Sequence, residues 1–263
     1  MLSNESFKAV TGMFREVSGI QLGEAKRALV TGRLQKLAQS RGMGDVNDYV
    51  KTLMEEGDPQ ELVRVVDKLT TNETYFFREP AHYDHLAAWL KQRRGTTRLR
   101  VWSGASSSGE EAYSLAMLLG DVLGLTGWEI VGTDLSTAMV QTAQRAVYPM
   151  DRARQMPDGY LKRWCRKGSG PYEGQLMVCR ELRANVQFTS ANLTRELPPI
   201  GEFDIIFLRN VLIYFDTAGK VDIVRRVLGH LKADGMLYTG HAESIANMEL
   251  PVRSIAPAVY VHA

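Results

Sequence analysis

The sequence predicts an α/β fold preceded by a helical region, and three observations lead to this class. Residues 1–80 carry apolar side chains at helical spacing and have little strand signal. From about Leu99, short apolar runs alternate with helical segments, as in a parallel sheet covered by helices. A Gly/Ser-rich loop, Gly104–Glu111, joins the first of these runs to a helix. We therefore expect a helical domain with its junction in residues 1–80 and an α/β domain in residues 81–263.

The N-terminal region predicts several short helices. Helical spacing is clearest in Phe7–Val17 and Glu61–Leu69. Polar or glycine-containing breaks occur at Ser18-Gly19, at Arg41–Asp45 and at Gly57-Asp58-Pro59. These breaks divide the region into elements that form a small helical domain.

The elements of the α/β domain follow one another in alternation. Five runs have the composition of strands: Leu99–Trp102, Trp128–Gly132, Val186–Ser190, Phe203–Leu208 and Met236–Thr239. Helices are expected at Glu110–Leu123, Ser136–Val147 and Lys220–Leu231. The segment from Leu231 to Leu237 has the pattern of a helix end, a tight turn and a new strand, and Ala258–His262 predicts a last edge strand.

One segment, Arg163–Leu182, interrupts the alternation. Two short strand candidates, Lys162–Arg166 and Gln175–Arg180, flank the turn-forming residues Gly168–Gly174. We expect a small antiparallel β-insert at residues 162–184, within the α/β domain.

The bulk composition excludes several classes of protein. The 263 residues carry a net charge of only +2, which does not indicate a nucleic-acid-binding protein. The two cysteines, Cys165 and Cys179, are too few for a structural zinc site, and no metal is expected. No apolar run has the length of a membrane span, and the first residues lack the pattern of a signal peptide. A cytoplasmic protein with free thiols is expected.

The glycine loop indicates a nucleoside site of unusual charge. The spacing Gly104-x-x-x-x-Gly109 resembles a phosphate-binding loop, which needs Lys and Ser/Thr next. Glu110 and Glu111 stand there instead, and two carboxylates repel a polyphosphate. The loop therefore suits a nucleoside that has no phosphates and carries positive charge. S-adenosylmethionine (SAM), with its sulfonium and ammonium groups, fits.

Two acids are candidates for cofactor contacts. Consecutive helical residues point about 100° apart, so one of the two glutamates faces the loop, and we assign this role to Glu110. Both acids also suit the helix dipole without any ligand. Asp134, at the end of the second strand, is the expected acceptor for ribose hydroxyls, or alternatively caps the next helix. The Gly-x-Gly-x-x-Gly pattern of nicotinamide enzymes is absent.

Further polar residues stand where ligands bind in open α/β sheets. Arg209, Asn210 and Tyr214 follow the strand Phe203–Leu208, at the carboxyl end where ligands lie. The junction segment Thr70–Pro80 carries Asn72, Thr74 and Arg78, all able to position a substrate. The guanidinium of Arg78 suits a carboxylate. The alternative for this segment is an interdomain linker with two packed phenylalanines.

Together these segments resemble the chemotaxis receptor methyltransferases of the CheR family, over nearly the whole chain and in the same order. The resemblance is carried by Thr70–Pro80, Val101–Ser114, Gly132–Ser136, Ala191–Leu193, Phe203–Asp216 and Gly240–Ser244. It implies an N-terminal helical domain and a Rossmann-like SAM-dependent methyltransferase domain that carries a small antiparallel β-subdomain. It places the cofactor contacts on Asn72, Thr74, Arg78, Glu110, Asp134, Asn192, Leu193, Arg209 and Asn210.

The resemblance also implies the reaction, methyl transfer from SAM to glutamate side chains on the cytoplasmic part of chemoreceptors, for sensory adaptation. A glutamate with an ordinary pKa is more than about 99% ionised at neutral pH, so no general base is needed. We hypothesise that Arg78 and Tyr214 act as the catalytic residues by orienting the incoming carboxylate.

Two regions are candidates for receptor contact. Residues 25–41 carry five bases and no acid, and Arg33 and Lys36 are the preferred contact pair, which the resemblance also indicates. The alternative is a packed helix whose basic side chains extend to solvent. The loop of Gly168, Gly170 and Gly174 resembles the form of the β-subdomain that binds a C-terminal receptor peptide as an added strand.

Two other functions compete with this interpretation. A methyltransferase of adenine amino groups usually has an Asn/Asp-Pro-Pro-Tyr-type motif after the fourth strand, where this chain reads Arg209-Asn-Val-Leu. A module that binds cofactor or receptor without catalysis would not need Glu110, Asp134, Asn210 and Tyr214 together.

Overall fold

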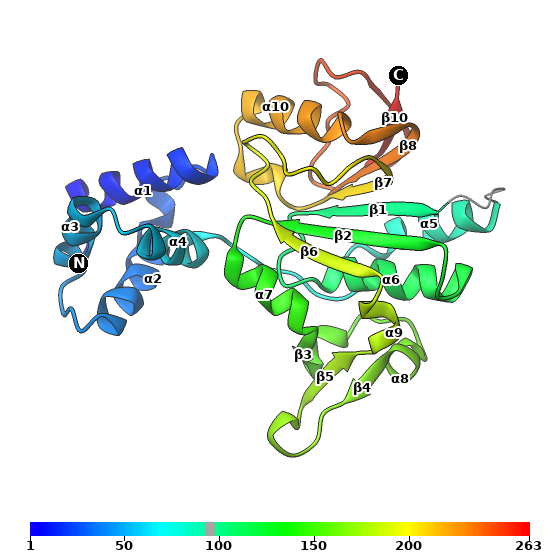
Figure 1. Ribbon diagram of the computed structural model, residues 1–263. Coiled ribbons are helices and arrows are strands. Elements are labelled where there is room, and N and C mark those ends of the chain that lie inside the picture. The colour runs from blue at the N-terminus through cyan, green and yellow to red at the C-terminus, as the bar shows by residue number, and fades with distance from the viewer. Residues whose placement is uncertain (93–97) are drawn as a thin grey trace.

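The computed structural model describes residues 1–92 and 98–263 (Figure 1). Its first part is a bundle of four helices, α1 (Asn4–Ser18), α2 (Arg27–Ser40), α3 (Val46–Glu56) and α4 (Pro59–Leu69), with a short 3₁₀ turn at Glu24–Lys26. The breaks expected between the helices of this region are confirmed, and they contain the residues that cap the helix ends. Gly19 and Gly57 end helices in the left-handed region, and Asp45 and Asp58 begin helices by accepting backbone N–H bonds. Apolar side chains from all four helices form one core.

Helix α5 (Pro80–Gln92) leads into a seven-stranded sheet. Its strands are β1 (Leu99–Gly104), β2 (Trp128–Asp134), β6 (Val186–Ser190), β7 (Phe203–Leu208), β8 (Leu231–Thr239), β9 (Val252–Ala256) and β10 (Val259–His262). Their order is β6-β2-β1-β7-β8-β10-β9. The five strands from β6 to β8 pair in parallel, and β10 pairs antiparallel with β8 and β9. The α/β class is thereby confirmed. The strand expected at Ala258–His262 exists as β10, but β9 covers its outer side.

Helices cover both faces of this sheet (Figure 1). Helices α5 and α6 (Glu110–Leu123) pack on one face and α10 (Thr217–Leu228) on the other. Because side chains alternate along a strand, neighbours in β1 enter different cores: Val101 lies under α6 and Trp102 under α10, both fully buried. Helix α7 (Thr137–Arg145) packs beside β2 and β6.

The tight turn expected between Leu231 and Leu237 lies within strand β8, as a bulge in its pairing with β7. Helix α10 ends at Leu228, and β8 already begins at Leu231, where the helix was predicted to end. The pairing of β7 with β8 shifts register between Phe203 and Ile205, which absorbs the extra residues of β8. A Cβ at Gly235 would stand 2.6 Å from the Leu231 side chain, so the chain folds closely here.

The β-subdomain projects away from the main sheet (Figure 1). Its three strands, β3 (Val147–Pro149), β4 (Cys165–Lys167) and β5 (Gln175–Val178), are antiparallel in the order β3-β5-β4. Strands lie near both expected places, but residues 162–164 belong to a helix, so β4 begins only at Cys165, and β5 ends at Val178. The sheet also contains β3, which lies outside the expected range 162–184. Residue 147, expected in a helix, belongs to β3, because Ala146 ends α7 in the left-handed region (φ 55°). Short helices α8 (Tyr160–Trp164) and α9 (Arg180–Arg183) flank this sheet.

No helix in the described ranges 1–92 and 98–263 is long and apolar enough to cross a membrane.

Candidate functional site

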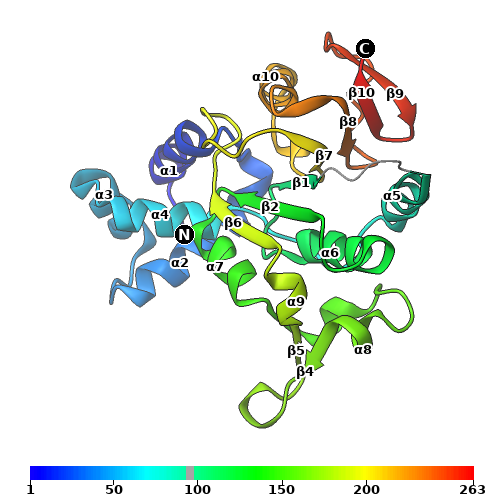
Figure 2. The same ribbon diagram turned by 45° about the vertical axis from the view of Figure 1, so that its right-hand side comes forward.

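A cavity of about 350 Å³ lies between the helical bundle and the carboxyl ends of the parallel strands. Figure 2 shows α1, α2 and α4 next to the ends of β1, β2 and β6. Three groups of residues line it: helical-bundle residues from Ser18 to Thr71, linker residues from Asn72 to Arg78, and residues that follow β1, β2, β6 and β7. Its size is that of a small-molecule site. Its place is the one expected for ligands of an open parallel sheet.

The loop after β1 turns sharply at the floor of this cavity. Ala105 (φ 59°), Ser107 (φ 50°) and Gly109 (φ 96°) all have left-handed backbone. A Cβ at Gly109 would stand 2.8 Å from the Ala143 Cβ, so both conformation and space require glycine there. The tight turn begins α6 directly below the cavity.

Asp134 lines the cavity at the end of β2. Its carboxylate accepts hydrogen bonds from the backbone N–H of Ser107 (2.7 Å) and of Ser136 (2.9 Å). The cap of α7 is Ser136, whose hydroxyl accepts from the Met139 N–H, so Asp134 is not the cap itself. Burial raises the pKa of Asp134 to about 6, although the hydrogen bonds from the two backbone N–H groups act in the opposite direction and lower it. The carboxylate is held in place beside the loop, as an acceptor of ribose hydroxyls requires.

Of the two glutamates that begin α6, Glu111 lines the cavity, and Glu110 is not among its described lining residues. The Glu110 carboxylate accepts from the Ser108 hydroxyl (2.6 Å) and lies 3.7 Å from the Arg152 guanidinium. Burial raises its pKa. Glu111 is therefore the glutamate of this pair that faces the cavity, and the cofactor contact expected of Glu110 stays a prediction. Helical phase explains this, because packing turns the Glu110 side chain behind the loop.

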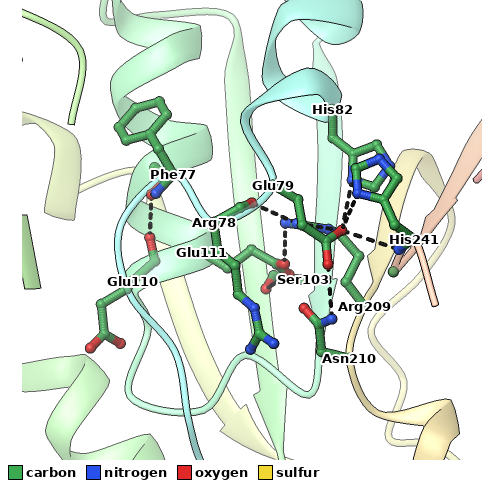
Figure 3. A network of polar contacts seen from close by, with 12 residues as sticks. Phe77, Arg78, Glu79, His82, Ser103, Glu110, Glu111, Arg209, Asn210 and His241 are labelled. Atoms are coloured by element: carbon green, nitrogen blue, oxygen red, sulfur yellow. Dashed lines mark hydrogen bonds and ion pairs between the residues drawn. The ribbon is translucent and has the colours of Figure 1, made fainter. Parts of the chain in front are cut away.

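Glu111 belongs to a buried ionic network with Arg209 (Figure 3). Glu111 Oε1 accepts from the Ser103 hydroxyl (2.8 Å), and Oε2 lies 3.0 Å from Arg209 Nη1. Arg209 Nη2 donates to the Arg78 carbonyl oxygen (2.6 Å) and lies 3.0 Å from Glu79 Oε2. Burial raises the pKa of Glu111, and the guanidinium opposes this. Arg209 thus joins strand β7, helix α6 and the linker in one wall of the cavity.

Glu79 and Glu243, to which the sequence analysis gave no role, hold this wall. Glu79 Oε1 accepts from the Asn210 amide (3.0 Å). Glu243 is nearly fully buried and accepts from the backbone N–H of Asn210 (2.6 Å), Gly240 (2.8 Å) and Ile213 (3.1 Å). Burial raises the pKa of Glu79, but hydrogen bonds from Asn210 and the charge of Arg209 lower it to about 2. Both acids lie inside segments that carried the family resemblance, which was the available signal.

The linker places its three predicted residues along the same cavity. The Asn72 carbonyl accepts from the Ser107 hydroxyl (3.3 Å), so the linker contacts the loop after β1. The Thr74 carbonyl accepts from the Arg152 guanidinium. Arg78 Nη1 donates to the Glu73 carbonyl (2.8 Å), and the side chain stays half-exposed. The linker is therefore an ordered wall of the site.

Asn192 and Leu193 also line the cavity, after β6. The Asn192 amide donates to the Val17 carbonyl (2.6 Å), and its Oδ1 accepts from the Thr194 N–H (2.9 Å). The Asn192 side chain therefore connects the α/β part to α1.

Tyr214 lies near the guanidinium groups of Arg78 and Arg33. Burial raises the pKa of Tyr214, and the positive charges of both guanidinium groups oppose this shift. Arg78 and Tyr214 both line the cavity, as the proposed catalytic pair requires.

The two basic residues proposed for receptor contact have different surroundings. Arg33 is half-buried and donates to the carbonyls of Leu69 (2.8 Å) and Thr70 (3.0 Å) at the end of α4. Lys36 is exposed. In the subdomain, Gly170 and Gly174 have positive φ, and a Cβ at Gly168 would overlap the Tyr172 carbonyl oxygen. The loop shape thus depends on these glycines.

A parallel sheet with a glycine loop after its first strand and a buried acid after its second defines a Rossmann-like, nucleoside-binding domain. The family model for the SAM-binding domain of CheR methyltransferases matches residues 72–261. The model for the all-alpha domain of the same enzymes matches residues 5–70. The chain therefore belongs to the CheR family of SAM-dependent methyltransferases.

Curated relatives are similar over nearly their whole length. A chemotaxis protein methyltransferase of Salmonella typhimurium is 36% identical, with 94% of this chain and 86% of that protein covered. Chemotaxis protein methyltransferase 2 of Pseudomonas aeruginosa is 37% identical, with 98% and 93% covered. A chemotaxis protein methyltransferase of Borreliella burgdorferi is 32% identical, with 92% and 88% covered.

Proposed function

We propose that this enzyme transfers methyl groups from SAM to glutamate side chains of chemoreceptors in the cytoplasm, and so serves sensory adaptation. One observation carries the proposal: acids suited to the cofactor and the groups suited to a substrate carboxylate line the same cavity. Asp134 and Glu111 stand on the sheet side, and Arg78 and Tyr214 on the linker and β7 side. The relatives named above are chemotaxis methyltransferases, which supports this substrate class.

The cavity fits SAM in size and charge. Asp134 is held by two backbone N–H groups and has acceptor capacity left for ribose hydroxyls. Glu111 adds a negative wall toward the cationic groups of the cofactor. We propose that the other contacts come from residues that line the cavity with them: Asn72, Thr74, Arg78, Asn192, Leu193, Arg209 and Asn210. Glu110 is the alternative to Glu111 for the contact with the cationic groups of the cofactor.

The main contribution of the protein to methyl transfer is to align the substrate carboxylate with the methyl group of SAM. When bound, SAM supplies a methyl group attached to a sulfonium sulfur. The glutamate oxygen bonds to this methyl carbon to form the ester, and the sulfur leaves as a neutral thioether. An ionised glutamate needs no base. Arg78 and Tyr214 orient the carboxylate so that oxygen, carbon and sulfur are in line. Such alignment supplies on the order of 7–11 kcal/mol of a reaction barrier.

Receptor binding is proposed at two surfaces. Exposed Lys36 on α2 steers the acidic receptor helices by long-range attraction, and Arg33 beside it holds the end of α4. The β-subdomain binds a C-terminal receptor peptide, which pairs with an edge strand, β3 or β4. Calorimetry with peptides from cognate receptor tails tests the second surface. Absence of heat with every such tail contradicts peptide binding and leaves the methyl-transfer proposal standing.

The decisive assay uses SAM with a labelled methyl group and receptor-enriched membranes. We expect label in the receptor band and its release as methanol in alkali, because glutamate methyl esters hydrolyse there. Labelled nucleic acid, or base-stable label on protein, would contradict the proposed substrate. Receptors in which the candidate glutamates are replaced by alanine are the matched control.

A further inference from the structure

A second cluster of ligand-type side chains lies beside the cavity wall. Glu79, His82 and His241 each offer one ligand atom, and these atoms lie within 4.8 Å of one another. Glu79 and His82 come from the linker and α5, and His241 from the loop after β8. Figure 3 shows both histidine rings next to the Glu79 carboxylate. We propose that these three residues bind a divalent ion of the Zn²⁺ class.

The distances match those between ligands on one ion. Glu79 Oε2 lies 3.6 Å from His82 Nδ1 and 3.3 Å from His241 Nδ1. Ligand atoms about 2.1 Å from a tetrahedral ion lie roughly 3.4 Å apart. The two imidazole rings are stacked with centroids 4.5 Å apart and planes at 29°. Because each Nδ1 lone pair lies in its ring plane, the exposed His241 ring must turn out of this stacking for both Nδ1 atoms to bind one ion. Two imidazoles and a carboxylate are the ligand types that Zn²⁺ accepts.

His82 supplies an independent observation. Its side chain is buried, with 1% of its surface exposed, and within the described part of the chain neither ring nitrogen has a hydrogen-bond partner. A buried polar atom without a partner costs free energy, about 1–3 kcal/mol. An ion on Nδ1 removes part of that cost. The aromatic rings of Phe207 and Tyr238 fix the ring's position at its edges.

The local charge also favours a cation. Glu79 and Glu111 both pair with Arg209, so two carboxyl groups surround one guanidinium here. Glu79 Oε1 accepts from the Asn210 amide, and Oε2 faces the histidines and also lies 3.0 Å from Arg209 Nη2, so the ion would share this oxygen with the guanidinium. His241 is exposed, which provides an entry path and leaves a coordination position for water. The bound ion connects the linker to the loop after β8, two segments that carry wall residues.

The test is metal binding by the full chain with any affinity tag removed. Zn²⁺ is titrated in competition with a chromophoric chelator, and Co²⁺ serves as a spectroscopic probe. We expect one ion per chain, a d–d spectrum of low coordination number without thiolate charge-transfer absorption, and a higher Tm with Zn²⁺. His241→Ala, at an exposed position, should weaken binding by at least about 10-fold, because even outer-sphere changes cost 10–100-fold.

The matched control is His230→Ala, which removes a half-buried histidine on another loop and should leave the affinity unchanged. Equal affinity in wild type and His241→Ala overturns the proposal. Thiolate absorption, which would place the ion at Cys165 or Cys179, also overturns it, as does the lack of stoichiometric binding. Glu79→Gln is the second variant and should weaken binding as His241→Ala does.

Discussion

Glu79 and Asn210, which lie 131 positions apart in the sequence, are joined by a 3.0 Å hydrogen bond from the Asn210 amide to Glu79 Oε1. Both residues have left-handed backbone, with φ of 58° and 57°. Such a conformation is uncommon for residues with side chains and needs surrounding contacts to hold it. Glu243 provides such contacts from the other side, through the N–H groups of Asn210 and Ile213. The carboxylates of Glu79 and Glu243 therefore hold the backbone of this cavity wall in place.

Glu243→Gln should destabilise the wall. The amide NH₂ of glutamine faces N–H donors that now point at a carboxylate, so at least one donor loses its partner, at about 1–3 kcal/mol. We expect a lower free energy of unfolding in urea and weaker binding of S-adenosylhomocysteine by calorimetry. Glu249→Gln, an exposed acid in the same region, is the control. Unchanged affinity in Glu243→Gln would show that the wall does not depend on this residue.

Cofactor affinity should fall as the pH is lowered through about 6, the pKa of Asp134. The ionised carboxylate accepts from ribose hydroxyls, and protonation removes that capacity, so between about pH 7 and pH 5 the affinity should drop up to about tenfold. Asp134→Asn should bind weakly at both pH values, with a flat profile in calorimetry. A steep profile that persists in Asp134→Asn would assign the titration to another group.

The ionisation of Asp134 should lower the free energy of unfolding of the cofactor-free protein, although the same ionisation strengthens cofactor binding. Its pKa is raised in the folded protein, so the stability that its protonated form contributes is present below about pH 4 and is lost as the pH rises through about 6. In the absence of cofactor, Asp134→Asn should therefore lose less stability than wild type between these pH values. Urea unfolding at both values measures this difference. An equal loss in both proteins would contradict it.

Glu111→Gln and Glu110→Gln separate the two glutamates of α6. Glu111 faces the cavity and shares Arg209 with Glu79, so its replacement should weaken cofactor binding and cost stability, since breaking a buried ion pair costs about 3–5 kcal/mol. Glu110→Gln keeps an acceptor for Ser108 and should change cofactor affinity little. Calorimetry with S-adenosylhomocysteine compares them. A larger loss in Glu110→Gln would return the cofactor contact to that residue.

Arg78→Ala and Tyr214→Phe should lower kcat with smaller effects on cofactor affinity. Both side chains line the cavity, and the proposed work of both is done on the substrate carboxylate. Loss of one alignment contact should cost about 10²-fold in rate. Turnover with receptor-enriched membranes is the measurement, and binding of S-adenosylhomocysteine is the control. Near-wild-type rates in both variants would exclude them as catalytic residues.

Lys36→Glu should slow methylation most at low salt, because screening weakens attraction between exposed charges. The matched control is Lys51→Glu, an exposed base on α3 of the same bundle. Arg33→Glu is expected to act differently, by releasing the carbonyls of Leu69 and Thr70 and lowering stability at every salt concentration. A salt-independent effect of Lys36→Glu would contradict steering.

The sequence by itself determined the fold class, the five parallel strands, the glycine loop and Asp134. Each is a local signal, since apolar periodicity, turn residues and the strand–loop–helix pattern are contained in short stretches of chain. Only the tertiary structure decided that Glu111 faces the cavity, that β3 completes the subdomain sheet, and that Arg33 holds the end of α4. These outcomes depend on helix phase and on partners far apart in the sequence, such as Glu79 and Asn210, which packing alone brings together.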